Sequence, residues 1–384
     1  MKKVLIGSAV AVLAVSASAQ EVKMPTIYGQ VNKAILYTSQ KKEMGYSKMS
    51  NLVDVKNSES RLGAKGTYEV NTLKVNYNLL AGLDSSDSGT TSGGAGAGRI
   101  RIRNAEVSFA DAWGTVFAGQ TGDIASLLGA KMDPLVTTVV GTLSTDQATY
   151  VKNATLSLGY LERGRVDQIG YKTPEFMGLQ YTVAASKILI NNNGDEATDD
   201  NSVAPSTATA THPGTRYYNL LSYNHKFNDM FKMEAYAGYN LLKSGFYKTY
   251  NDYLGALSLT YGEFTLNGEY TKLNREKQMA GSFKMKNTMI QSSVKWTHGD
   301  HSVALTWANR KNEEAAKATG TAANNGKYNQ IAAGYMYNLN KYVQLRGVYA
   351  HYTTKTESTT TTTTDGLPFK NTADIFSVGT LVTF

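Results

Sequence analysis

The chain has 384 residues, a formal net charge of +8 and no cysteine, which excludes disulfide scaffolds, thiol catalysis and cysteine-ligated zinc. A soluble chain of this length usually divides into two or more domains, but no linker divides this one. The basic residues are dispersed and accompany no nucleic-acid-binding motif, so we expect no nucleic-acid partner.

The N-terminal segment has the three parts of a secretory leader. Lys2 and Lys3 precede an apolar stretch at 4–15, which is followed by four small residues. Such segments are removed on export, so we expect a leader at 1–19 and one mature domain at 20–384. Without the two lysines the formal charge falls to +6. The mature chain has no apolar run near the roughly 18 residues that a spanning helix needs.

Apolar and polar side chains alternate over segments of about ten residues, most clearly in the second half. One face of the segment 231–241 carries Phe231, Met233, Ala235, Ala237, Tyr239 and Leu241, and the other carries Lys232, Glu234, Tyr236, Gly238 and Asn240. A period of two places each set on one side of a sheet. A lysine facing lipid at mid-bilayer costs about 2–4 kcal/mol, so the pattern predicts one wet face and one lipid face.

Short and long connections alternate along the chain. We expect short turns at 111–114, 173–178, 228–230, 261–263, 298–300 and 339–341. We expect long polar loops near 39–57, 84–97, 121–163, 189–214, 243–249, 274–285, 312–326 and 355–371. The segments between them predict about 16 strands. An even number allows the first strand to pair with the last and leaves no open edge. The predicted fold is an all-β transmembrane antiparallel barrel in an outer membrane.

The loop at 121–163 is longer than a hairpin needs and contains apolar stretches at 124–128 and 135–143. A long loop that buries side chains is commonly functional. We expect this third loop to fold inward and pack on the barrel wall.

Several motifs resemble the Gram-negative general porins, a family of trimeric 16-stranded barrels. They are Thr26-Ile-Tyr-Gly29, Ser60-Arg-Leu-Gly-Ala-Lys-Gly66, Arg103-Asn-Ala-Glu-Val-Ser-Phe109, Trp113-Gly-Thr-Val116, Ala118-Gly-Gln120, Gly164-Arg165-Val166 and the terminal Phe384. The resemblance implies a homotrimer in which the third loop narrows each pore. It also implies basic side chains on one wall, facing carboxylates on that loop.

The family pattern places Arg61, Arg103 and Arg165 in the basic wall. Strand parity adds Lys65, and also Arg99 and Arg101, which alternate with isoleucines. Gln30 stands where the family has a lysine. The loop acids Asp123, Asp133 and Asp146 are candidates to face this wall, and the sequence leaves open which of them does. Opposed charges across a narrow pore create a transverse field that favours polar solutes.

Two features depart from the simple alternation. If Arg103 faces inward, Asn104 and Glu106 are expected to face outward, which fits a trimer contact or a bulge. In 165–172, Val166 and Ile169 do not share a face without a bulge.

Other motifs are interpreted as ordinary loop or turn residues. These are the glycine run 93–98, the His298-Gly-Asp-His301 turn, the acidic stretch 191–200 and the threonine run 359–364. The glycines precede no helix, so they are not a phosphate-binding loop. No nucleophile–base arrangement is apparent, so no enzyme activity and no cofactor or metal are expected.

We therefore predict a passive outer-membrane channel for small hydrophilic solutes and ions. Its expected partners are two further copies of the chain, outer-membrane lipid and lipopolysaccharide, and the barrel assembly machinery through Phe384. A substrate-specific porin with a saturable site and a barrel that acts mainly as an adhesin are the alternatives. Ion preference, pore radius and trimer contacts stay open.

Overall fold

The computed structural model describes residues 24–40, 48–55, 58–84, 99–122, 128, 130–141, 165–190, 196–197, 212–245, 247–277, 283–316, 324–358 and 369–384. The expected leader lies outside these ranges and stays a prediction. Within them, no helix has the length and apolar character needed to cross a membrane.

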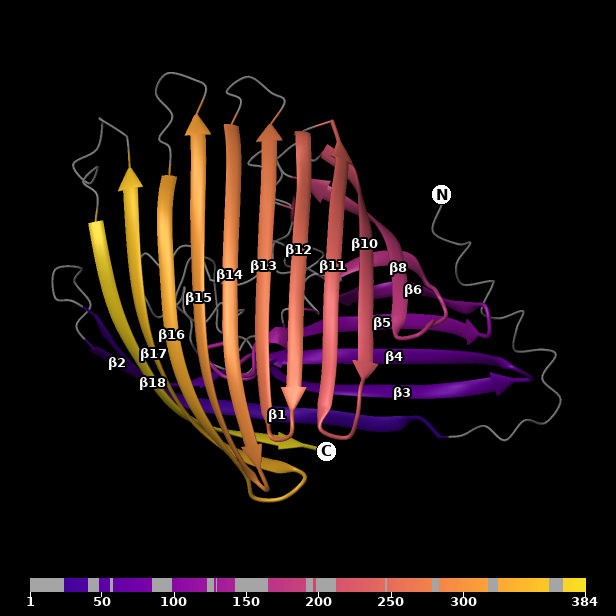
Figure 1. The fold of residues 1–384 in the computed structure, drawn as a ribbon, viewed down its shortest axis with the longest axis horizontal. Coiled ribbons are helices and arrows are strands. Elements are labelled where there is room, and N and C mark those ends of the chain that lie inside the picture. Colours follow the sequence, from indigo (N-terminus) through magenta and orange to yellow (C-terminus); the bar gives the residue numbers. More distant parts are fainter. Residues whose placement is uncertain are drawn as a thin grey trace.

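The described residues form β-strands almost throughout (Figure 1). The strands are β1 Thr26–Gln40, β2 Lys48–Asp54, β3 Ser60–Val70, β4 Leu73–Asp84, β5 Arg99–Asp111, β6 Gly114–Gly122, β7 Arg165–Lys172, β8 Leu179–Ile190, β9 Glu196–Ala197, β10 His212–Lys226, β11 Phe231–Ser244, β12 Tyr247–Tyr261, β13 Phe264–Lys277, β14 Phe283–His298, β15 His301–Ala316, β16 Asn324–Asn338, β17 Val343–Ser358 and β18 Phe369–Thr383.

The sheet closes on itself. β1 pairs antiparallel with β18 from Gln30↔Thr383 to Gln40↔Ala373, and its first residues pair with β3. β8 pairs directly with β10, and the two-residue β9 only extends the edge of β8. β2 and β3 occupy successive parts of one wall position beside β1. The result is a closed antiparallel barrel of 16 strands, which confirms the predicted fold class.

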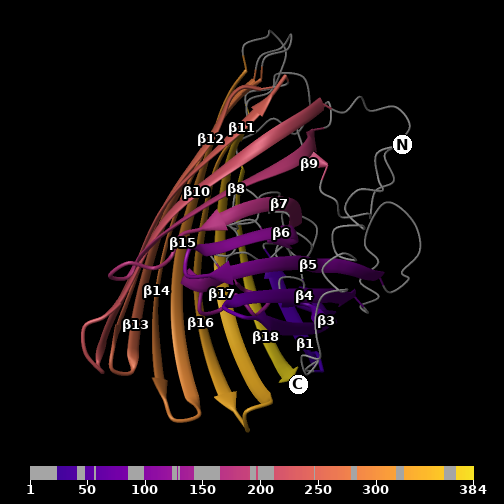
Figure 2. The same ribbon diagram turned by 90° about the vertical axis from the view of Figure 1, so that its right-hand side faces the viewer.

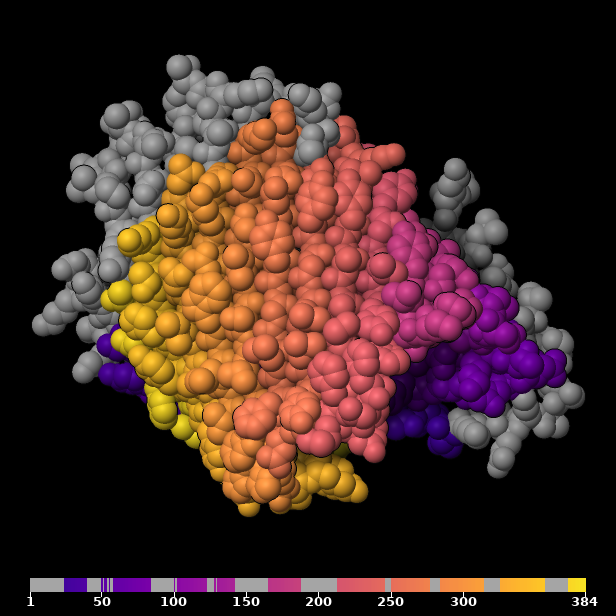
Figure 3. Space-filling view, viewed as in Figure 1, coloured from indigo at the N-terminus to yellow at the C-terminus, as the bar shows by residue number. Residues whose placement is uncertain are grey.

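The predicted alternation of faces is present in the wall. On β15, Val303 and Leu305 are 39% and 52% exposed, whereas Ala304 is fully buried and Thr306 is 3% exposed. Exposed apolar side chains point outward and small or polar ones point into the lumen, where other groups cover them. Figure 3 shows one continuous outer face that runs from β10 to β17. The wet and lipid faces were therefore assigned correctly.

The two rims differ, as expected. All six predicted short turns join consecutive strands at one rim, and the hairpin turn at 71–72 is a seventh at that rim. Figures 1 and 2 show these tight turns at one end of the upright strands; at the opposite end most strands are separated by longer stretches of sequence. One expectation is wrong. The predicted long loop at 243–249 is a short link, because β11 continues to Ser244 and β12 begins at Tyr247.

Two irregularities shape the wall near β3 and β5. Gln30 pairs with Arg61 and Lys33 with Asp54. Asp54 and Arg61 are seven residues apart, whereas their partners Lys33 and Gln30 are three residues apart on β1. The chain between β2 and β3 therefore contains four extra residues. In β5, Leu80 pairs with Asn104 but the adjacent Ala81 pairs with Ile102, which leaves Arg103 as an extra residue. This is a β-bulge, which re-aims a side chain and shifts the parity beyond it.

The structure shows which faces of the wall Asn104, Glu106, Val166 and Ile169 occupy. Asn104 is the partner of Leu80, and Leu80 is 8% exposed while its neighbour Leu79 is 55% exposed. Asn104 and Glu106 therefore share the inward face, not the outward one. In β7, Val166 is buried and Ile169 is 61% exposed. These two residues lie on opposite faces, and no bulge is needed.

The barrel closes around a tight contact between its first and last strands. The Gly29 amide donates to the Phe384 carbonyl at 2.9 Å, and the Phe384 amide donates back at 3.1 Å. A Cβ on Gly29 would lie 2.5 Å from the Arg61 carbonyl oxygen and 2.6 Å from the Phe384 ring. Only glycine fits here without moving backbone.

We predict that Gly29→Val destabilises the barrel by about 1–3 kcal/mol, the usual cost of overpacking. Gly347→Val is the matched control, because a Cβ at Gly347 has no atom within 4 Å. The measurement is urea unfolding of the refolded protein in lipid vesicles. Equal midpoints for the two variants would contradict the proposed crowding at the closure.

Candidate functional site in the barrel lumen

An ion pair joins Arg103 to Glu59 on the inner wall. Arg103 protrudes from the β5 bulge, and Glu59 comes from the extra residues before β3. Their side chains are only 11% and 2% exposed. A carboxylate this buried is costly unless it is paired. Glu59 was missed by sequence reasoning, because the insertion that brings it inward has no periodicity of its own.

Gln30 holds the inserted segment and the next arginine together. Its side-chain amide nitrogen donates to the Ser58 carbonyl at 2.7 Å and to the Glu59 carbonyl at 3.1 Å. Its side-chain oxygen accepts from Arg61 Nη2 at 2.8 Å. A lysine, expected from the family pattern, has no acceptor for Arg61. Gln30 is therefore a connector between two strands of this wall.

The remaining residues of the predicted basic wall fall into three groups. Arg165 Nη1 donates to the Arg103 carbonyl at 2.6 Å and also to the Asn104 side chain, which brings Arg165 to the same place. Lys65 is exposed, with Nζ 5.0 Å from the centre of the Tyr28 ring. The backbones of Arg99 and Arg101 in β5 pair with Asp84 and Gly82 in β4, but the side chains of the two arginines lie outside the described part of the structure.

The three predicted loop acids are only partly described. Asp123 and Asp146 lie outside the described residues. Asp133 is 1% exposed, and its Oδ1 accepts from the Leu135 amide at 2.8 Å. That hydrogen bond stabilises the turn that follows it. The pore-facing role of all three acids stays a prediction.

The described part of the third loop, residues 130–141, lies against inward-facing side chains. Leu135, Val139 and Val140 are buried in one cluster with small wall residues of β15 to β17 such as Ala332 and Ala350. The wall also donates hydrogen bonds to main-chain carbonyls of the loop. These run from Ser293 Oγ to Met132 at 3.0 Å, from Asn32 Nδ2 to Thr137 at 3.0 Å, from Arg346 Nη1 to Thr137 and from Gln330 Nε2 to Val140. The inward fold of the whole loop stays a prediction, because 123–127, 129 and 142–164 are not described.

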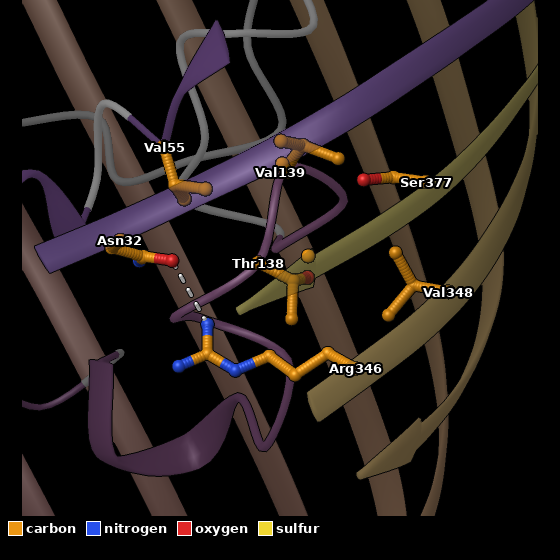
Figure 4. A pocket seen from close by; sticks show the side chains of 9 residues that line it. Asn32, Val55, Thr138, Val139, Arg346, Val348 and Ser377 are labelled. Atoms are coloured by element: carbon orange, nitrogen blue, oxygen red, sulfur yellow. Dashed lines mark hydrogen bonds between the residues drawn. The ribbon is translucent and has the colours of Figure 1, made fainter. Parts of the chain in front are cut away.

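Figure 4 shows a small cavity between this segment and the wall. Thr138 and Val139 line it from the loop, and Val348 and Ser377 line it from the barrel. The Arg346 side chain extends beneath the loop, and its Nη1 donates to Asn32 Oδ1 at 3.3 Å. Asn32 on β1 and Arg346 on β17 therefore both donate hydrogen bonds to the Thr137 carbonyl of the loop.

At the start of this loop segment, an ion pair joins the loop to β11. Lys131 Nζ lies 2.6 Å from Glu234 Oε2 and donates to the Tyr236 hydroxyl at 2.5 Å, and both partners belong to β11. Burial of Lys131 opposes its charge, but the hydrogen bonds to Glu234 and Tyr236 outweigh this and raise its pKa. Residues 130–141 therefore contact the wall from β11 round to β1.

A second group of arginines lies nearer the long-loop rim and was not predicted. Arg216 Nη2 donates to the Tyr250 hydroxyl at 3.0 Å, and Arg275 Nη2 donates to the same oxygen at 2.7 Å. Arg310 of β15 also sits at an inward position, whereas the inward Arg346 lies near the start of β17, at the short-turn end. Strand parity alone can indicate such inward positions. The partner tyrosine depends on strand register, which the sequence leaves open.

A closed barrel with an apolar outer face, a polar lumen and a segment, residues 130–141, docked on the inner wall is the architecture of a membrane channel. A model of the Gram-negative porin family matches residues 7–357. The chain belongs to the Gram-negative porin family, whose members are outer-membrane channels for passive diffusion.

Solved structures agree with this assignment at the level of the fold. The anion-selective porin from Comamonas acidovorans is similar with a TM-score of 0.59 and 20% identity, covering 94% of this chain and 99% of that one. The outer-membrane channel DcaP of Acinetobacter baumannii gives 0.61 and 13%, covering 96% and 100%. OmpT of Vibrio cholerae, in its trimer form, gives 0.57 and 11%, covering 94% and 100%. No curated protein matches the chain.

We predict that the Glu59–Arg103 pair shows strong thermodynamic coupling. Glu59→Gln alone leaves a buried guanidinium uncompensated, which typically costs about 3–5 kcal/mol. The double variant Glu59→Gln/Arg103→Gln should be more stable than either single variant. Unfolding of all four proteins in urea gives the coupling energy. Additive single effects would show that the two side chains act independently.

Proposed function

We propose that the protein is a homotrimeric general diffusion porin, with no catalytic step, whose conducting path is narrowest between two sets of groups. One set is Arg61, Arg103 and Arg165 with Glu59, and the other is the loop 121–163. The observation that carries the proposal is the docking of residues 130–141 onto wall side chains from β11 to β1.

The partners of the wall arginines favour general diffusion over one saturable solute site. Arg61 is bonded to Gln30, Arg103 is paired with Glu59, and Arg346 is bonded to Asn32. Their hydrogen-bonding capacity is used at least partly within the barrel. A fixed array of this kind orders charge along the pore and acts on any passing ion or dipole.

An outward polar cluster supports assembly of several copies. On β17 and β18, Asp374 Oδ1 accepts from the Tyr349 hydroxyl at 2.6 Å and lies 2.8 Å from His351 Nδ1. Both ionisable side chains are more than 40% exposed on the outer face of the single chain. Charged groups are costly against lipid, so coverage by a second copy fits this face better. The proposal also includes export through the leader at 1–19 and recognition of Phe384 by the barrel assembly machinery.

We predict stepwise, ohmic conductance when the protein is reconstituted in a planar bilayer. Arg103→Ala removes a positive charge and leaves Glu59 as a net negative group, so the reversal potential in a salt gradient should shift towards cation preference. The permeability ratio should change by about twofold. Arg61→Lys, which keeps the charge, is the control. A silent but inserted protein would refute the channel, and an unchanged reversal potential would remove Arg103 from the pore.

We further predict that deletion of residues 130–141 increases single-channel conductance, because the docked segment occupies lumen cross-section. Heat-modifiable migration on a gel checks that the variant still forms a barrel. An adhesin-like barrel would bind cells or matrix equally well with and without the segment. Conductance that saturates with one solute in the intact protein would instead favour the substrate-specific alternative.

A further inference from the structure

A patch of small residues lies on the inner wall beneath the docked segment of the third loop. Gly334 on β16 pairs with Ala304 on β15, and two residues further along β16, Ala332 pairs with Ala350 on β17. All four residues are buried at inward positions. Larger buried side chains border the patch at both ends, namely Met336 and Arg346 at one end and Gln330 and Tyr352 at the other. The wall is therefore lowest at Gly334, which has no side chain.

Leu135 of the loop occupies the space that a side chain at position 334 would need. A Cβ built on Gly334 would lie 2.5 Å from Leu135 Cδ2 and 3.1 Å from Val348 Cγ1. Leu135 is fully buried and belongs to one apolar cluster with Ala304, Ala332 and Val348. A residue larger than glycine at position 334 therefore displaces Leu135, because packed interiors leave little room for added volume.

Leu135 is fixed within a turn that has its own hydrogen bonds. Its amide donates to Asp133 Oδ1 at 2.8 Å. Its carbonyl accepts from the Thr138 amide at 2.9 Å and from Thr138 Oγ1 at 2.8 Å. The Gly141 amide closes the next turn on the Thr138 carbonyl at 3.3 Å. A displacement of Leu135 away from the wall therefore carries residues 133–141 with it.

Attraction and steric contact together set the height of this segment above the wall. The hydrogen bonds from Gln330 to Val140 and from Asn32 to Thr137 draw the segment towards the wall. At Gly334, Leu135 meets a residue without a side chain, so the segment comes close. Cores respond to the volume of a single methylene group. The size of the residue at position 334 therefore determines how far the segment projects into the lumen.

We propose that Gly334 is a positioning residue for the third loop. Its missing side chain lets Leu135 sit against the backbone of β16, and this contact fixes how much of the lumen the loop leaves open. The inference rests on the channel function proposed above and specifies a residue that sets the size limit for uncharged solutes. Gly334 is buried beneath the loop, so it acts through Leu135 and touches no solute itself.

The test compares Gly334→Val with Gly347→Val, which adds the same side chain to the outer face of the neighbouring strand, where a Cβ has no atom within 4 Å. Swelling of proteoliposomes measures the entry of uncharged sugars of increasing size, from a pentose to a trisaccharide. Gly334→Val should exclude the largest sugar that the wild type admits, because the loop segment then projects further into the lumen. Gly347→Val should match the wild type, and Gly334→Val/Leu135→Ala should recover the wild-type limit.

An unchanged or larger size limit in Gly334→Val would overturn the proposal, as would a failure of Leu135→Ala to restore the limit. Urea unfolding of the same proteins tests the contact without transport. Gly334→Val should lower the midpoint, and the added Leu135→Ala should raise it again, since the two side chains compete for one space. Wild-type vesicles that admit no sugar would refute the channel and the sizing role together, whereas the midpoints would still report the contact between Leu135 and position 334.

Discussion

The closed ring of backbone hydrogen bonds is the constraint on which this structure depends. In lipid no water satisfies an exposed N–H or C=O group, so a β-structure crosses a membrane only without free edges. The pairing of β1 with both β18 and β3 meets this requirement at the chain's two ends. The Gly29–Phe384 contact completes it at the short-turn rim. The lumen, the docked loop segment and the outer surface all depend on this closed ring of hydrogen bonds.

A closed ring limits where the chain can build irregular structure. The lipid-facing part of the wall needs a regular, apolar surface, and the extra residues of this chain lie on the inner face. The four residues inserted before β3 and the single extra Arg103 in β5 follow this rule, and together they produce the Glu59–Arg103 pair. The pair is therefore assembled from two departures from regular pairing on neighbouring parts of the wall. The groups proposed to set selectivity therefore arise at two irregularities of a regular sheet.

The sequence predicts the regular strands well and the irregular positions of the wall poorly. Period-two alternation predicted the two faces of β11, because lipid and water impose opposite costs on successive residues. Turn composition predicted six of the short connections and about 16 strands. For Asn104 and Glu106 the sequence left a trimer contact or a bulge open, and the structure has the bulge, which turns both residues inward. Glu59 and the wall donors Gln330 and Arg346 were missed because their roles depend on register across distant strands. The loop at 243–249 was overestimated, because polar residues there continue β11 and begin β12.

The docking of the third loop has a consequence for sequence divergence. The wall donors from Asn32, Ser293, Gln330 and Arg346 end on main-chain oxygens of the loop. A carbonyl is present whatever side chain its residue bears. A substitution at a loop position such as Thr137 therefore keeps these hydrogen bonds, whereas replacing a donor on the wall removes them. The side chains of the loop can change in this way without any change in the barrel that supports it.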